Sequence, residues 1–111
     1  MTNPSLLAAI LDSLRDPVLF ADTGHMIRYM NKAAIAHFDE GEALLGRSLF
    51  DCHNKRSCEI IVETLAAFER GEDERLITDK PEERIYMRAV RDSGGAVLGY
   101  YERYESRERT T

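Results

Sequence analysis

The spacing of apolar residues predicts an amphipathic helix at the start of the chain. Over residues 4–14 they recur every three or four positions, which is typical of a helix with one buried face. Asn3 can cap this helix, with Pro4 at its first position. The apolar face consists of Leu6, Leu7, Ile10, Leu11 and Leu14. Such a face needs to be covered, either by the chain's own sheet or by another surface.

A hairpin and a second helix are expected next. Residues 18–21 and 26–30 have the β-branched and apolar character of two strands. Between them, Asp22-Thr23-Gly24 offers short side chains and a glycine for the position of positive φ that a tight turn needs. Asn31 is expected to stop the second strand and to cap a helix over residues 32–38.

The second half of the chain predicts one long helix and then a sheet. The helix follows Asn54 or Ser57 as its cap, ends at Gly71, and has on one face Cys58, Ile61, Val62, Leu65 and Phe68. Residues 39–52 predict only short, broken helices. Strands are expected over residues 74–79, 84–90 and 96–104, with a turn at Ser93-Gly94-Gly95. The last strand has apolar or aromatic residues on both faces, so both faces should be covered.

Composition indicates one globular domain whose charge does not favour binding to nucleic acid or another polyanion. A chain of 111 residues, 43% of them apolar, can bury about 65% of its unfolded surface without a disulfide or a metal. Fifteen basic and twenty acidic residues are interleaved and give a net charge of −5, which argues against binding to nucleic acid or to an anionic membrane. The sequence has no apolar run of membrane-spanning length and no leader pattern, and it has only two cysteines, so we expect a cytoplasmic protein.

Three short motifs, in order, resemble those of the PAS domain family. Asp22, Gly24 and Asn31 match its opening hairpin and helix start, Leu45-Gly46-Arg47 matches its Leu-Gly-Lys/Arg segment, and residues 94–100 match its last hairpin. The resemblance covers roughly residues 11–104. It implies an α+β PAS fold, with a five-stranded antiparallel sheet in the order 2-1-5-4-3, helices on one face and an N-terminal flanking helix. We therefore predict a single domain over residues 1–111, with a core at 15–104, the leading helix at 4–14 and a polar tail at 105–111.

The resemblance also implies a sensory or signal-transduction module, of the kind found in bacterial sensors, that binds a small molecule between sheet and helices. From strand alternation and helix phase, with Ala21 as a neighbour, the expected pocket lining is Leu19, Ile27, Ile35, Phe38, Leu49, Cys52, His53, Ile61, Leu65, Phe68, Ile77, Ile85, Met87 and Leu98. With so many aliphatic residues available, the protein's own side chains can also fill this space. The alternative function is then a ligand-free dimerisation or protein-interaction module.

A homodimer is the partner that the resemblance implies, because the leading helix of a PAS domain often packs against its copy in a second subunit. The expected seam consists of Leu6, Leu7, Ile10, Leu14, Tyr100 and Tyr101. The competing interpretation is that the helix covers its own sheet, and the periodicity alone does not distinguish the two.

The segment from Asp51 to Cys58 concentrates the residues that bind metals and cofactors. Its Cys52-His53 pair resembles a subgroup of bacterial PAS domains with Cys-His after the Gly-Arg segment, although Asn54 stands where that subgroup usually has proline. His53 has three interpretations: an axial haem ligand, a polar contact to another pocket ligand, or a structural histidine near a helix start. Zinc is disfavoured because Cys52, His53 and Cys58 provide only three ligands. The motif of the flavin-photoadduct subgroup is absent.

Catalytic chemistry finds no support in the sequence. The three histidines are scattered, and no nucleophile elbow or phosphate-binding glycine loop is present. We therefore expect a protein that is not an enzyme.

Overall fold

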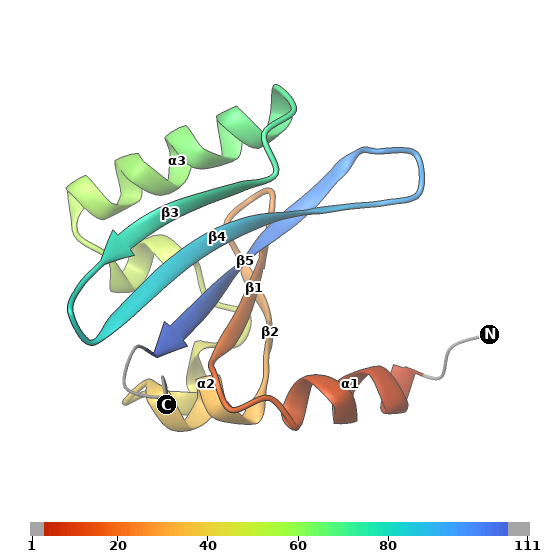
Figure 1. The fold of residues 1–111 in the computed structure, drawn as a ribbon, viewed down its shortest axis with the longest axis vertical. Helices are drawn as coiled ribbons and strands as arrows, with labels where there is room; N and C mark the ends of the chain where they lie inside the picture. The colour runs from red at the N-terminus through yellow and green to blue at the C-terminus, as the bar shows by residue number, and fades with distance from the viewer. Residues whose placement is uncertain (1–3, 107–111) are drawn as a thin grey trace.

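The computed structural model describes residues 4–106 and has the predicted α+β architecture (Figure 1). Five strands form one antiparallel sheet in the order β2-β1-β5-β4-β3, so the expected strand order is confirmed. The strands are β1 (Val18–Asp22), β2 (Ile27–Met30), β3 (Glu74–Asp79), β4 (Glu83–Arg91) and β5 (Val97–Ser106). The helices are α1 (Pro4–Asp12), α2 (Lys32–His37) and α3 (Lys55–Glu69), with 3-10 turns η1 (Gly41–Leu44) and η2 (Leu49–Cys52).

Helix α3 covers one face of the sheet, which we call the inner face. It begins where the sequence predicts, because the Asn54 side chain accepts a hydrogen bond from the Ser57 amide at 2.8 Å. Its buried side consists of Ile61, Thr64, Leu65, Ala67 and Phe68. Val62, which the spacing placed on the same face, is instead 49% exposed. The core therefore lies between α3, the short helices and the inner face.

Asn31 connects three separate segments at the start of the domain. Its Oδ1 accepts hydrogen bonds from the amides of Val18 (3.0 Å) and Ala34 (2.9 Å), and the second of these caps α2 as predicted. Its Nδ2 donates to the carbonyls of Leu11 (3.0 Å) and Asp16 (3.1 Å). The side chain is fully buried, and each of its polar atoms has two partners. One residue thus fixes the end of α1, the start of β1 and the start of α2.

The β1–β2 turn differs from the prediction in its residue of positive φ. That residue is His25, with φ of 65°, and not Gly24. The Asp22 carboxylate accepts hydrogen bonds from the amides of Gly24 and Met26 and so closes the turn. In this turn the residue with left-handed backbone is His25, one position after the glycine expected from the sequence. The ring of His25 stacks on Phe50 at 4.5 Å, and its Nδ1 lies 2.9 Å from the Tyr100 hydroxyl oxygen. These contacts offset the strain of the histidine backbone.

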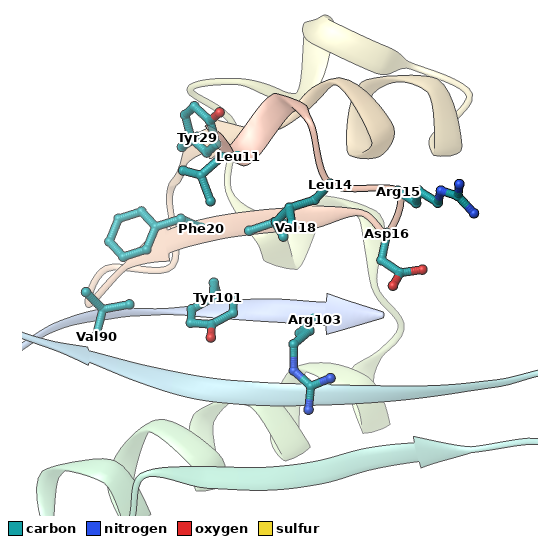
Figure 2. A pocket seen from close by; sticks show the side chains of 10 residues that line it. All are labelled: Leu11, Leu14, Arg15, Asp16, Val18, Phe20, Tyr29, Val90, Tyr101 and Arg103. Carbon is teal, nitrogen blue, oxygen red and sulfur yellow. The ribbon is translucent and has the colours of Figure 1, made fainter. Parts of the chain in front are cut away.

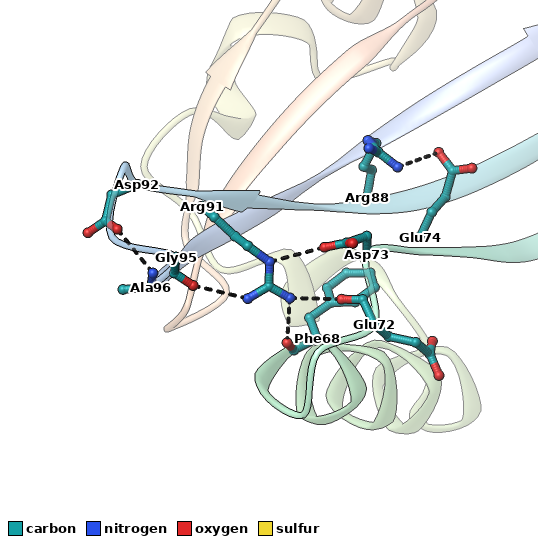
Figure 3. A network of polar contacts seen from close by, with 9 residues as sticks. All are labelled: Phe68, Glu72, Asp73, Glu74, Arg88, Arg91, Asp92, Gly95 and Ala96. Carbon is teal, nitrogen blue, oxygen red and sulfur yellow. Dashed lines mark hydrogen bonds and ion pairs between the residues drawn. The ribbon is translucent and has the colours of Figure 1, made fainter.

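Arg91 fastens the end of α3 to the sheet (Figure 3). Its guanidinium donates to the carbonyls of Phe68 (2.7 Å), Glu72 (2.9 Å) and Gly95 (3.1 Å) and to the Asp73 carboxylate (3.1 Å). These acceptors come from the last turn of α3, the segment before β3 and the β4–β5 turn. The planar guanidinium of arginine donates in several directions at once, so it can reach these four acceptors better than a lysine ammonium could.

A bulge in β5 corrects two predictions from the sequence. The register between β4 and β5 shifts between Val90 and Arg91, so residue 98 has no partner and the alternation restarts after it. As a result Leu98, an expected pocket residue, is 48% exposed. Tyr100, an expected seam residue, is fully buried on the inner face. Glycine is needed at position 99, because a Cβ there would lie 2.8 Å from the Phe20 ring and 2.9 Å from the Asp22 Cα.

The ends of the domain differ slightly from the predicted bounds. Helix α1 ends at Asp12 rather than at residue 14, and β5 continues to Ser106, so Glu105 belongs to the sheet and not to a tail. The predicted cap Asn3 and residues 107–111 of the predicted tail lie outside the described residues.

Candidate functional site

The outer face of the sheet has a large apolar hollow beside the end of α1 (Figure 2). It has a volume of about 670 Å³. Its floor is formed by side chains of β1, β2, β4 and β5, and its wall by Leu11 in the last turn of α1 and Leu14 just after the helix. Three aromatic residues lie in one row across the floor, since Phe20 pairs with Tyr29 on one side and with Tyr101 on the other. This row is the centre of the hollow.

The other half of the outer face has compensated charges. The same row of paired positions continues across the sheet with two charged residues. Arg88 on β4 pairs with Tyr101, and Glu74 on β3 pairs with Arg88. Arg88 and Glu74 form an ion pair at 3.6 Å, and Arg103 lies 3.8 Å from Glu74 and 4.3 Å from the centre of the Tyr86 ring. The outer face of β3 and the adjoining part of β4 therefore carry paired charges beside the exposed Leu76, whereas β1 and β2 with parts of β4 and β5 form the apolar hollow.

Helix α1 extends the apolar surface away from the sheet. The end of the helix is held to the domain: Asn31 donates a hydrogen bond to the Leu11 carbonyl, and the Asp12 carboxylate accepts from the Lys32 amide at 3.0 Å and the Tyr29 hydroxyl at 3.4 Å. In Figure 1 the helix points away from the sheet toward the N-terminus. It has no buried residue, and four of its expected seam residues are 44–55% exposed, namely Leu6, Leu7, Ile10 and, just after the helix, Leu14. The interpretation that α1 covers its own sheet is wrong.

The inner face contains a second, much smaller cavity. Its volume is about 120 Å³, and it lies between α3 and strands β3, β4 and β5. The apolar wall consists of Ile60, Ile61, Ile77 and Ile85. The polar groups around it belong to His53, Ser57, Thr78, Glu102 and Tyr104.

Glu102 is the unexpected residue of this cavity. It is 4% exposed, and its two neighbours across the sheet, Leu19 and Met87, are buried apolar residues. The Tyr104 hydroxyl donates to Oε2 at 3.3 Å. Burial raises the pKa of the Glu102 carboxyl, and the nearby His53 opposes that rise. The sequence contained a signal for Glu102, because it lies two residues from Tyr100 and two from Tyr104 on the same face of β5.

The residues expected to line a pocket fall into two groups: some line the inner cavity, and the others are packed in the core. His53, Ile61, Ile77 and Ile85 line the cavity. The others belong to the packed core, or pack against it, and fill the space between sheet and helices; these are Leu19, Ile27, Ile35, Phe38, Leu49, Leu65, Phe68 and Met87. Leu98 lies outside this group, and the side chain of Cys52 lies outside the described part of the chain. Most of the predicted pocket is therefore occupied by the protein itself.

His53 does not have room to hold a haem. Its Nδ1 donates to the Leu49 carbonyl at 2.7 Å, which fixes the ring at the edge of the cavity. Sites for organic ligands typically measure about 300–1,000 Å³, and a porphyrin does not fit in 120 Å³. Among the described residues, no three His, Cys, Asp or Glu side chains are grouped so that they could hold a metal ion.

The sequence and the fold together define the family. A family model described as PAS domain matches residues 7–105, so the chain belongs to the PAS domain family. PAS domains are generally sensory, signal-transduction modules rather than enzymes. No curated protein matches the sequence.

Several solved structures share the fold at low identity. The C-terminal domain of a protein from Streptococcus mutans is 18% identical, with 95% of this chain and 85% of that one covered and a TM-score of 0.79. A PAS domain from Colwellia psychrerythraea is 13% identical (92% and 94% covered, TM-score 0.71). The PAS domain of nitrogen regulation protein NR(II) from Vibrio parahaemolyticus is 18% identical (91% and 97% covered, TM-score 0.64). Within residues 4–106, none of the helices is both long and apolar enough to cross a bilayer.

Proposed function

We propose that this chain is a PAS signalling module that assembles as a homodimer through α1 and the apolar half of the outer sheet face. The observation that carries the proposal is the continuity of one apolar surface, from Leu6, Leu7 and Ile10 on α1, through Leu14, into the 670 Å³ hollow. An apolar surface of this extent on a soluble domain is typical of a protein–protein contact. PAS domains commonly dimerise, which supports the same conclusion.

A second copy fits this surface in charge as well as in polarity. The apolar face of α1 has no charged residue, whereas Arg15, Asp16 and Arg103 lie at the edge of the hollow. In a two-fold dimer the same surface meets itself, so the uncharged face of α1 would pack against an uncharged face and bury no charge. The charges of the β3–β4 half are already paired within the chain and need no partner.

Sedimentation of the parent chain beside Ile10→Asp and Val62→Asp tests this dimer. Both substitutions place a carboxylate at a half-exposed aliphatic position, but Val62 lies on α3, away from the proposed seam. The parent and Val62→Asp should sediment as dimers and Ile10→Asp as a monomer, because a carboxylate in an apolar interface loses its hydration. A monomeric parent chain, or equal dissociation of both variants, would contradict the proposal.

The inner cavity favours a second role for the same module, the sensing of a small molecule. Its support is the meeting of a buried carboxyl, a histidine and hydroxyl groups around an apolar space. The 120 Å³ volume limits that molecule to a few non-hydrogen atoms. A thermal-shift screen of small metabolites should detect stabilisation of the parent chain that disappears in Ile85→Phe, where the larger ring fills the cavity. Equal responses of both proteins would place binding elsewhere.

A further inference from the structure

The apolar face of α1 continues the wall of the outer hollow toward the N-terminus. Leu7 precedes Leu11 by four residues, so the two side chains lie on one face of the helix. Leu11 lines the hollow (Figure 2), whereas Leu7 is 48% exposed. Ile10, three residues after Leu7, is 52% exposed. The face therefore begins at the hollow and extends into turns of the helix that residues 4–106 leave half exposed.

We propose that α1 of each subunit lies in the hollow of the other, where its aliphatic residues contact the aromatic row of Phe20, Tyr29 and Tyr101. The inference rests on the homodimer proposed above and names how the two copies are joined. It differs from a seam in which the two α1 helices pack on each other and both hollows stay open. Because the dimer is two-fold, each subunit contributes one helix and one hollow. An amphipathic helix that lays its apolar face in a groove is a recurring mode of recognition.

The area that a stable dimer buries favours this arrangement. Helix α1 has nine residues, so it is about 14 Å long at 1.5 Å per residue. Leu6, Leu7 and Ile10 are about half exposed, and a whole leucine side chain offers on the order of 100 Å² of apolar area. The three side chains together can therefore bury on the order of 150 Å². A stable interface buries about 800 Å² on each partner, so a seam of α1 on α1 alone is too small.

The hollow offers the apolar area that the helix lacks. Phe20, Tyr29 and Tyr101 are only partly buried, and an aromatic side chain buries about 150–250 Å² when it is fully covered. The volume of 670 Å³ corresponds to about twenty water molecules at roughly 30 Å³ each, so several side chains of a helix are needed to fill it. The aromatic row and the apolar face of α1 both lack ionised groups, so their contact removes no charge from water.

A pair of opposite charges introduced into the full chain tests the arrangement by sedimentation at neutral pH. Leu7→Lys places an ammonium on α1, and Tyr101→Glu places a carboxylate on the floor of the hollow. Each single substitution should weaken dimerisation by at least about tenfold, because a charge in an apolar seam loses its hydration. The double variant should dimerise about tenfold more tightly than Leu7→Lys alone, since the ammonium of each subunit then meets the carboxylate of the other. High salt should reduce this gain.

Leu76→Glu is the matched control. Leu76 is a 43% exposed aliphatic residue on the outer face of β3, outside the hollow. Leu76→Glu should dimerise like the parent chain, and adding it to Leu7→Lys should restore nothing. Val90→Glu, also on the floor of the hollow, is measured beside Tyr101→Glu, so that the test does not depend on the folding of one variant. Circular dichroism checks that each variant is folded.

The possible failures are distinguishable. If the parent chain is a monomer, the dimer proposal fails and this inference fails with it. If the parent is a dimer and both floor variants dimerise as tightly as the parent, the hollow lies outside the seam and only the exchange of α1 is wrong. A double variant that dimerises no more tightly than Leu7→Lys would also overturn the exchange, because the two introduced charges would then not meet across the seam.

Discussion

Tyr100 and Tyr101 are neighbours on β5, but they lie in opposite environments. Tyr100 is fully buried under the helices, with its hydroxyl beside His25, whereas Tyr101 forms part of the floor of the open hollow. The inner face is closed by α3 and the short helices, and the cavity described there measures about 120 Å³. The apolar half of the outer face is bordered by the end of α1 and retains 670 Å³. The chain's own side chains therefore pack the inner face, whereas the outer face is the surface through which we propose that the domain assembles.

The largest effect should come from a deletion in the inner layer. Phe68 is fully buried against the sheet, so Phe68→Ala should lower the free energy of unfolding by about 3–5 kcal/mol through lost burial and the cavity left behind. Urea denaturation measures this change. Val62→Ala on the exposed side of the same helix should change it by no more than about 0.5 kcal/mol. Similar losses for the two variants would mean that α3 is not packed on the sheet as described.

Asn31→Asp should have the next largest effect, because Asn31 connects the end of α1, beside the outer hollow, to the starts of β1 and α2. Aspartate keeps the acceptor that caps α2, but it replaces the two donors to Leu11 and Asp16 with an oxygen that faces their carbonyls. Losing two buried hydrogen bonds should lower the free energy of unfolding by about 2 kcal/mol. Because Leu11 follows the exposed part of α1, hydrogen exchange in α1 should also accelerate. Unchanged exchange would show that α1 is held by other contacts.

The sequence predicted the fold well, because each of the deciding signals is local. Asn31 and Asn54 cap helices where their position before an apolar repeat predicted it. The strand order came from the resemblance to PAS domains rather than from alternation, which gives strands but not their neighbours. The family model over residues 7–105 and the sheet order confirm that assignment.

The candidate sites were harder to predict, since they depend on register and on volume. A single unpaired residue in β5 moved Leu98 outward and left Tyr100 inside, and alternation alone does not reveal such a bulge. Glu102 was overlooked because a charged residue in a strand is normally expected to face water. Whether aliphatic residues line a cavity or fill it depends on side-chain packing, which no sequence pattern encodes.

Glu102→Gln should have a smaller effect of opposite sign. The folded pKa of Glu102 is raised above its ordinary value of 4.5, so its contribution to stability is fully present below about pH 4.5 and is lost as pH rises through the folded pKa. The glutamine variant avoids that loss. It should match the parent near pH 4 and exceed it by about 1 kcal/mol at pH 8, measured by urea denaturation across pH. A variant that is less stable at pH 8 would mean that the ionised carboxylate is compensated within the folded chain.

The smallest effect on the folded monomer should come from Leu7→Ser on α1. Leu7 is 48% exposed, so its replacement should alter the free energy of unfolding by no more than about 0.5 kcal/mol in dilute solution. If α1 forms the dimer seam, however, the melting temperature of the parent should rise with protein concentration, because association stabilises only the folded state. Leu7→Ser should flatten that dependence. Ala66→Ser, at an exposed position of α3, should leave it unchanged. If the melting temperature of the parent does not depend on protein concentration, the chain does not dimerise through the outer face, and no second copy occupies the hollow.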